Sequence, residues 1–223
     1  MDISVIAILV IASLIGSGLI ALAIRRGGQS EEKIQEFARA QGWRYSQDPQ
    51  TGTTRLRDLK DDWTLQIIFS GDGAVDGMTH RRVEWHSPHG ALPEGEAVLG
   101  MPLPEKSVAM MQAGGAFGQQ ILQASLKATL HALGKTGFDL RIDEDTAGDP
   151  GGVVMATPGQ ETAMNTLRKN VTLADIRSTT KTEAVPVIIR NPDGLTLRRP
   201  GAVKDLQDLT VMVDLGKSLR DDL

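Results

Sequence analysis

The longest apolar run of the chain lies at its start. From Ile3 to Ile24 there are 22 residues without a charge, and three serines are the only polar side chains. A helix that rises about 1.5 Å per residue needs roughly 20 such residues to cross a hydrocarbon core of about 30 Å. The run therefore predicts one membrane-spanning helix that anchors the rest of the chain to a bilayer.

A cleaved signal peptide is the alternative interpretation, because Ala21-Leu22-Ala23 offers a small-residue cleavage site. A signal peptide needs basic residues before an apolar stretch of about 7–15 residues. Here no Lys or Arg precedes the run, and the run is longer. These flanking features favour a retained anchor.

Charges on the two sides of the anchor predict its orientation. Arg25, Arg26 and Lys33 follow the run, whereas Asp2 precedes it. Positively charged flanks stay in the cytoplasm. We therefore expect a single-pass membrane protein, with the domain after the anchor in the cytoplasm.

Small residues recur along the anchor at helical spacing. Ser13, Ser17 and Ala21 are four residues apart. Such a stripe lets two membrane helices approach closely, which predicts another transmembrane protein as a partner besides the lipid bilayer. The competing interpretation is that Gly, Ala and Ser are common in any membrane helix.

After the anchor, the apolar pattern alternates between helical and extended periods. Residues 30–32 combine a capping serine with two acids, and Gly42 is suited to end the helix that they begin. Trp43–Tyr45 begins a strand. Residues 63–69 and 79–86 alternate apolar and polar positions, and the glycine-rich residues 71–77 predict the turn of a hairpin.

The middle of the chain is less clear. Residues 97–99 predict a short strand, and Glu105–Leu133 reads as helical with glycine interruptions. The apolar stripe of its second half is Leu122, Leu126, Leu130 and Leu133. Its first half contains Met110 and Met111, and helix, hinge and loop all remain open there.

The last ninety residues predict strand, strand, helix, strand, strand, helix. Residues 138–142 and 153–155 are the first two strands, and Thr157-Pro158-Gly159-Gln160 resembles a helix start with Thr as the cap. Residues 185–190 and 195–198 flank a turn at 191–194, which predicts a second hairpin. Leu206, Leu209, Met212 or Val213, and Leu219 mark a terminal helix.

This order predicts an α+β fold in which mainly antiparallel strands carry helices on one face. We expect an anchor and linker at residues 1–28, a helix with antiparallel strands at 29–104, and the remaining elements at 105–223. The last two parts are expected to pack as one body.

Three short motifs accompany this order: F-A-R-A-x-G-W-x-Y at Phe37–Tyr45, F-D-L-R-I at Phe138–Ile142, and I-I-R-x-x-D-G-L at Ile188–Leu195. With the anchor, they make the chain resemble a broad family of uncharacterised bacterial proteins held by one membrane helix. The resemblance covers most of the chain. It implies architecture and placement, and it brings no catalytic residues.

Composition excludes several chemistries. The net charge is −4 and the isoelectric point is about 5.6, so nucleic acid is not an expected partner, since phosphate backbones attract a Lys and Arg excess. The absence of cysteine removes disulfides, thiol nucleophiles and thiolate metal sites. No motif demands a cofactor, and none is expected.

The weak metal candidates are His80, Glu84, His86 and His89, because imidazole and carboxylate suit zinc or iron. Arg82 would stand among them, and the simpler interpretation is a polar strand face opposite Val83 and Trp85. Catalytic residues stay unknown.

Two other motifs fail on spacing. Asp143, Asp145 and Asp149 resemble a calcium loop, but Ala147 and Val154 occupy ligand positions. Gly134-Lys135-Thr136 lacks the upstream glycine of a phosphate-binding loop, because Thr129 stands there.

The leading hypothesis is an interaction or assembly protein. The alternatives are a membrane-tethered hydrolase or metal-dependent enzyme that uses the His80–His89 region, and a binding module for a small ligand or lipid headgroup.

Overall fold

A computed structural model describes most of the chain after the predicted anchor. The described residues are 31–70, 80–102, 140–146, 149–179, 185–201 and 205–223, with a few isolated positions between them. The predicted anchor with its arginines and small-residue stripe, the turn at 71–77 and nearly all of 105–133 lie outside them. Within the described ranges, no helix combines the length and apolar character needed to cross a membrane. The chain divides into two units, Met1–Tyr45 and Ser46–Leu223.

In the first unit, the helix over residues 31–40 ends at Gly42 as predicted. Gly42 has a φ of +74°, a conformation that glycine adopts without strain. Its N–H donates to the carbonyl of Arg39, and the Trp43 N–H donates to the carbonyl of Ala38 at 2.8 Å. The Trp43 ring meets Phe37 edge-on, 5.7 Å between centroids. These bonds and the ring contact form a Schellman motif, which satisfies the last carbonyls of the helix.

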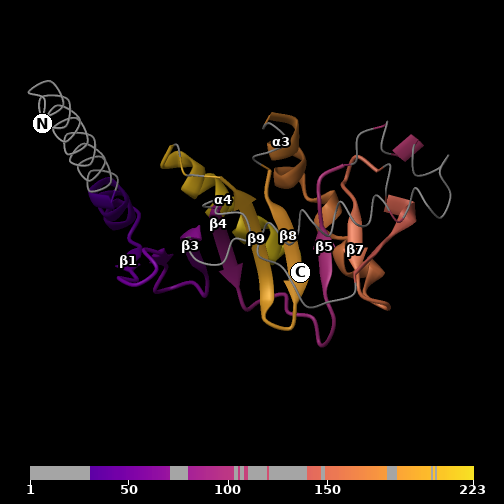
Figure 1. The fold of residues 1–223 in the computed structure, drawn as a ribbon, viewed down its shortest axis with the longest axis horizontal. Coiled ribbons are helices and arrows are strands. Elements are labelled where there is room, and N and C mark those ends of the chain that lie inside the picture. Colours follow the sequence, from indigo (N-terminus) through magenta and orange to yellow (C-terminus); the bar gives the residue numbers. More distant parts are fainter. Residues whose placement is uncertain are drawn as a thin grey trace, which may run out of the picture. The chain divides into compact units, whose positions relative to one another are not determined.

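The second unit is built on one antiparallel sheet. Its strands follow the order β2-β3-β4-β9-β8-β5-β7-β6, and each neighbouring pair is antiparallel. Figure 1 shows β4, β9, β8, β5 and β7 side by side. The strand bounds are β1 Arg44–Gln47, which crosses the boundary between the units, β2 Thr54–Arg57, β3 Thr64–Ser70, β4 His80–Ser87, β5 Ala97–Leu99, β6 Arg141–Ile142, β7 Val154–Ala156, β8 Val187–Asn191 and β9 Gly194–Pro200.

Both predicted hairpins are confirmed. Strands β3 and β4 pair along their length, with Leu65 opposite Trp85. Strands β8 and β9 pair up to Asn191 opposite Gly194. Gly194 has a φ of +131°, and a side chain on it would overlap the carbonyl of Ser87. Glycine is therefore the residue that this tight turn permits.

Two details differ from the predictions. The polar stretch before residue 63 contains a strand, β2, in which Thr54 and Leu56 are buried and the residues between and after them are exposed. Four residues with one large apolar side chain give too weak an alternation to be recognised.

The expected helix start at Thr157 is wrong. The Thr157 hydroxyl bonds to the backbone of Glu96, which precedes β5, and Gly159 turns the chain with a φ of +88°. Short 3-10 turns follow, η2 at Glu161–Met164 and η3 at Leu167–Lys169, before helix α3 at Val171–Thr179. Asn170 caps α3, since its Oδ1 accepts the Leu173 N–H at 2.8 Å.

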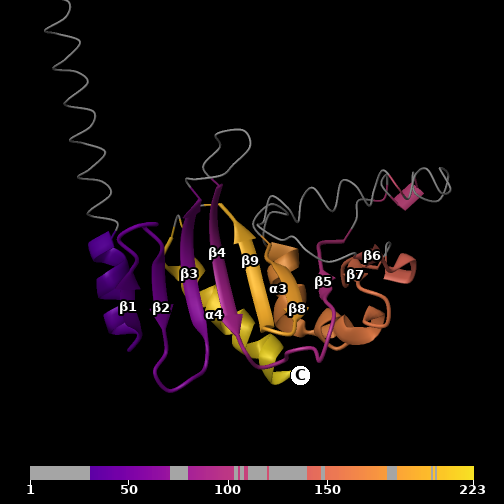
Figure 2. The ribbon, with the colours of Figure 1, turned by 60° about the horizontal axis from the view of Figure 1, so that its bottom comes forward.

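Helix α4, Gln207–Asp221, covers one face of the sheet. It contacts β4 and β9, and Figure 2 shows it across those strands. Its buried residues are Leu209, Met212, Val213, Leu215, Gly216 and Leu219. They meet a sheet face formed by residues such as Leu65, Trp85 and Leu197, all fully buried. The alternation that places Val83 and Trp85 on the packed face of β4 is confirmed. The described part is thus an α+β fold with a large antiparallel sheet, as the sequence predicts.

Candidate functional site

The other face of β4 carries the predicted polar residues. Arg82, Glu84 and His86 alternate with buried Val83 and Trp85, and each of the three is half-buried. Register places Glu84 opposite Arg198 of β9, and His86 opposite Thr196. Side chains directly opposite in an antiparallel pair lie on the same face, so these five positions form one polar strip.

Glu84 is held between two arginines. Its Oε2 accepts from Nε of Arg198 at 2.6 Å and lies 3.7 Å from Nε of Arg82. Burial lowers the pKa of Arg82, and the Arg198 charge lowers it further, while Glu84 opposes both. The carboxylate that the metal hypothesis uses is therefore the counter-ion of an arginine pair.

The histidines lie in different surroundings. Nδ1 of His86 is 3.1 Å from Oγ1 of Thr196, on the polar strip. His89 is exposed beyond the end of β4 and lines a pocket with residues of β8 and α4. The side chain of His80, at the start of β4, is outside the described part. Among the side chains that are described, no three of His, Asp or Glu gather as a metal site would require.

The carboxylates of the loop after β6 form an ion pair and hydrogen bonds with other groups of the protein. Oδ2 of Asp149 forms an ion pair with Arg168 at 2.6 Å, and its Oδ1 accepts the Gly151 N–H. Oδ1 of Asp143 accepts the Asp145 N–H at 3.2 Å. These bonds give the carboxylates of Asp143 and Asp149 a structural role.

The same loop is tied to helix α3 by a half-buried arginine. Arg177 donates to the carbonyl of Gly151 at 2.5 Å and to that of Gly100 at 2.8 Å. Burial, reinforced by the nearby charge of Arg168, lowers the pKa of Arg177 to about 10.

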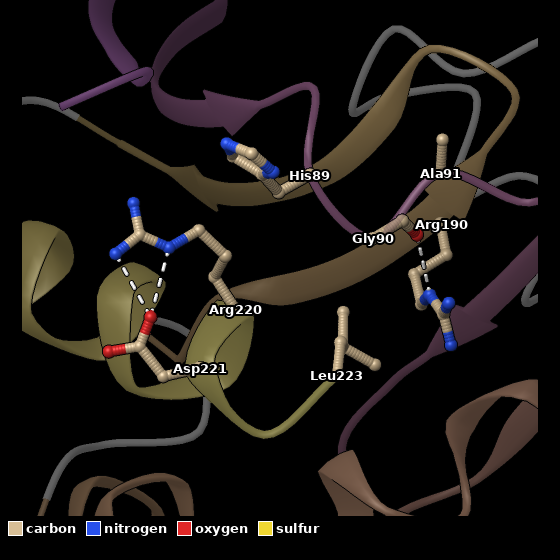
Figure 3. A pocket seen from close by; sticks show the side chains of 7 residues that line it. All are labelled: His89, Gly90, Ala91, Arg190, Arg220, Asp221 and Leu223. Atoms are coloured by element: carbon tan, nitrogen blue, oxygen red, sulfur yellow. Dashed lines mark hydrogen bonds and ion pairs between the residues drawn. The ribbon is translucent and has the colours of Figure 1, made fainter.

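One pocket brings together charged residues from three separate segments. It has a volume of about 450 Å³ and is lined by the loop after β4 (His89, Gly90, Ala91), by Arg190 of β8, and by Arg220, Asp221 and Leu223 at the end of α4. Figure 3 shows Arg190 and Arg220 on opposite sides of Leu223, with His89 nearer to Arg220.

Arg190 is fixed in this pocket by main-chain acceptors. Its Nε donates to the carbonyl of Gly90 at 2.9 Å, and Nη1 donates to that of Ala163 at 2.5 Å. Among the residues that the structure describes, no carboxylate pairs with it. Burial lowers the pKa of Arg190. The guanidinium therefore brings a positive charge without a matching acid.

Arg220, across the pocket, is balanced by two acids. Nη1 bonds to Oδ1 of Asp61, while Nε and Nη2 bond to Oδ1 of Asp221 at 3.0 and 2.9 Å. Lys217 adds an ion pair with Asp61 at 3.3 Å. Although burial opposes it, bonding to Arg220 and Lys217 lowers the pKa of Asp61. Arg220 thus ties α4 to the loop before β3.

Sequence reasoning missed Arg190 and Arg220 as site residues. They are separated by thirty positions, and their meeting with His89 depends on the β4–β9–β8 strand order. The only signal in the sequence is the arginine in the I-I-R run of β8, which was counted as part of a structural motif.

Comparison with known proteins gives no further identification: no family model, curated protein or solved structure matches the chain.

Proposed function

We propose that the chain is a membrane-anchored interaction or assembly protein of a bacterial inner membrane, with its α+β domain in the cytoplasm. The observation that carries this proposal is the uncharged run from Ile3 to Ile24, bordered by Arg25 and Arg26. A run of this length is stable as a helix in a bilayer, and the arginines favour the cytoplasmic side.

The described domain supports an interaction role over hydrolysis. Three of the acids discussed above, Glu84, Asp149 and Asp61, each have an arginine partner. These ion pairs join separate elements of the domain: Glu84 links β4 to β9, Asp149 links its loop to η3, and Asp61 links the loop before β3 to α4. These acids are therefore suited to hold the domain together.

Membrane insertion and orientation are tested first. The full chain should stay in the membrane fraction after an alkaline wash that strips peripheral proteins. A C-terminal reporter that is active only in the periplasm should be inactive, and one that fluoresces only in the cytoplasm should be bright. Release by the wash would contradict the anchor, and the reverse reporter result would contradict the orientation.

The interaction role is tested by replacing the small residues that form the stripe on the anchor. In one variant Ser13, Ser17 and Ala21 are all changed to Leu, which blocks close approach of a second helix but preserves insertion. The control changes Ile15 and Leu19 to Val. Partners that co-purify from membranes with the native chain and the control should be lost from the stripe variant. Equal recovery in all three would remove the stripe from the proposal.

A further inference from the structure

We propose that the sheet face opposite α4 docks on anionic lipid headgroups of the membrane that holds the chain. The inference rests on the proposed anchor, because a tethered domain meets the lipid surface at a high effective concentration. This face carries the polar strip of β4 and β9 and continues across β3 to β2, while α4 packs against Trp85 on the other face (Figure 2).

Strand register assigns the side chains of this face. Residues directly opposite each other in antiparallel strands share a face, and such pairs connect β2 through β3 and β4 to β9. The charged residues placed there are Arg55, Arg57, Arg82, Glu84 and Arg198, which together define the arginine face. The arginines are spread over a width of about 14 Å at the usual strand spacing.

One acid on the arginine face does not balance four arginines. Glu84 accepts from Arg198 at 2.6 Å and lies 3.7 Å from Arg82, so these three groups together keep one positive charge. Arg55 and Arg57 are exposed. Within the described ranges neither of them forms an ion pair, so both add their charge to the face.

Asp48, in the turn before β2, also interacts with the charge of Arg55. Hydrogen bonds from Gln50 and Thr51 are the main cause that holds the pKa of Asp48 below its ordinary value, and Arg55 adds to them. One carboxylate at the end of β2 balances at most one arginine. The arginine face therefore keeps an excess of positive charge.

The α4 side of the sheet has the opposite balance. Ion pairs to Arg199 and Asp61 add one charge of each sign there. An anionic surface thus attracts the arginine face and repels the side of α4, which orients the domain. The charged residues of α4 and its C-cap are four acids and two cations, Asp208, Asp214, Asp221, Asp222, Lys217 and Arg220.

A bilayer surface suits arginines that are spread over several strands. Headgroups form an extended layer of negative charge, so the arginines do not have to converge on one point, and each basic side chain near the layer adds attraction. The anchor also keeps this strand close, since β2 is only the second strand after it along the chain.

Docking is tested with the full chain in nanodiscs of phosphatidylcholine or of an equimolar mixture with phosphatidylglycerol. The chain has no cysteine, so Gln66→Cys carries a fluorophore on the arginine face, and Val211→Cys, 48% exposed on α4, carries it on the other side. A nitroxide on the lipid headgroups quenches nearby fluorophores. We expect quenching of the Gln66→Cys label in the anionic discs only, and little quenching of the Val211→Cys label in either.

Charge reversal then tests the arginines. Arg57→Glu, added to Gln66→Cys, should lower the docking equilibrium constant at least about tenfold, because each basic residue near an anionic surface contributes a factor of about five. Lys169→Glu, at an exposed position of η3, is the matched control and should leave the quenching unchanged. If labelling at Gln66 unfolds the domain, as judged by circular dichroism, Thr64→Cys on the same face replaces it.

Failure of the anchor and failure of docking give different results. A chain that does not elute with the nanodiscs contradicts the anchor, and this inference with it. A chain that elutes with them but is not quenched in the anionic discs contradicts docking alone and indicates an acidic protein as the ligand of the arginines. Equal quenching of the Gln66→Cys and Val211→Cys labels, or no effect of Arg57→Glu, would also overturn the inference.

Discussion

Gly216 allows helix α4 to lie directly on the indole of Trp85. A Cβ at this position would be 2.5 Å from Cε2 and 2.7 Å from Cε3 of that ring. Both are closer than real carbon contacts, and neither residue has room to move because Trp85 is fully buried in the sheet. One missing methyl group thus determines how closely the helix approaches the sheet.

Gly216→Ala should lower the free energy of unfolding by about 1–3 kcal/mol, the usual cost of overpacking a core. Helix propensity alone predicts the opposite, because Ala is favoured over Gly by about 1 kcal/mol. Urea unfolding of the full chain measures the sign. Asp214→Ala, at an exposed position of the same helix, is the control and should not destabilise. A more stable Gly216→Ala protein would contradict the contact with Trp85.

At the scale of elements, the two C-terminal helices are joined through Asn170. Its Oδ1 caps α3, and its Nδ2 donates to Ser218 at 2.9 Å and to Asp222 at 2.7 Å. Asn170 is only 5% exposed, so these bonds are shielded from water. A buried amide with donors and acceptor all engaged fixes how α3 meets the end of α4.

Asn170→Ala should lower the free energy of unfolding by about 1–2 kcal/mol, because it removes a helix cap and leaves its partners unsatisfied. Thermal unfolding followed by circular dichroism measures the loss. Asn165→Ala is a matched control, since Asn165 is exposed. An effect of equal size at Asn165 would show that Asn170 has no special role.

The link between α4 and the loop before β3 predicts a pH dependence. Bonding to Arg220 and Lys217 holds the pKa of Asp61 below its ordinary value of 3.8 in the folded state. The unfolded state therefore binds this proton first as the pH falls, so the stability that Asp61 contributes is present above pH 3.8 and is lost as the pH drops through the lower, folded value.

Asp61→Asn should thus destabilise the protein by about 1 kcal/mol at neutral pH, a magnitude typical of partly exposed ion pairs. The difference from wild type should shrink below pH 3.8. Chemical unfolding of both proteins across the acid range measures it. Asp62→Asn, at the exposed neighbouring position, should show a smaller difference. A difference at Asp61 that is constant with pH would contradict the ion pair.

Periodicity in the sequence was sufficient to predict the elements that bury one face and expose the other. The hairpins, the helix ending at Gly42 and the stripe of α4 were predicted because apolar positions repeat at the strand or helix period. Strand β2 was missed because its pairing with β3, rather than its own composition, makes it a strand. Thr157 was misassigned because its hydroxyl bonds to Glu96, 61 positions away in the sequence.

The candidate site was predicted less well, because it too depends on contacts between residues that are distant in the sequence. Arg190 and His89 meet through the pairing of β8 and β4 with β9. No local pattern in the sequence records such a meeting. Conversely, Glu84 and His86, which were only weak metal candidates, share a polar strand face as predicted, and their partners on it are Arg198 and Thr196 of β9.

At the scale of the whole molecule, the anchor prediction can be tested by thiol cross-linking. The chain has no cysteine, so only an introduced cysteine can react. If Ser13, Ser17 and Ala21 line a helix contact, a single Ser17→Cys should form cross-links in native membranes with a thiol-reactive bifunctional reagent. Ile15→Cys, on the opposite side of the same helix, should not. Gel mobility of the cross-linked chain measures both. Equal cross-linking from the two positions would indicate random collision.

The placement of the three tryptophans has an optical consequence. Trp43 belongs to the first unit and is half-buried, whereas Trp63 and Trp85 belong to the second and are almost completely buried. Single-tryptophan variants would therefore give each unit its own fluorophore. Trp43 alone should emit at longer wavelength and be quenched by iodide, and the other two should be shielded. During unfolding, the onset of iodide quenching at Trp63 or Trp85 would report when the sheet opens. The signal of Trp43 would report separately when the first helix frays.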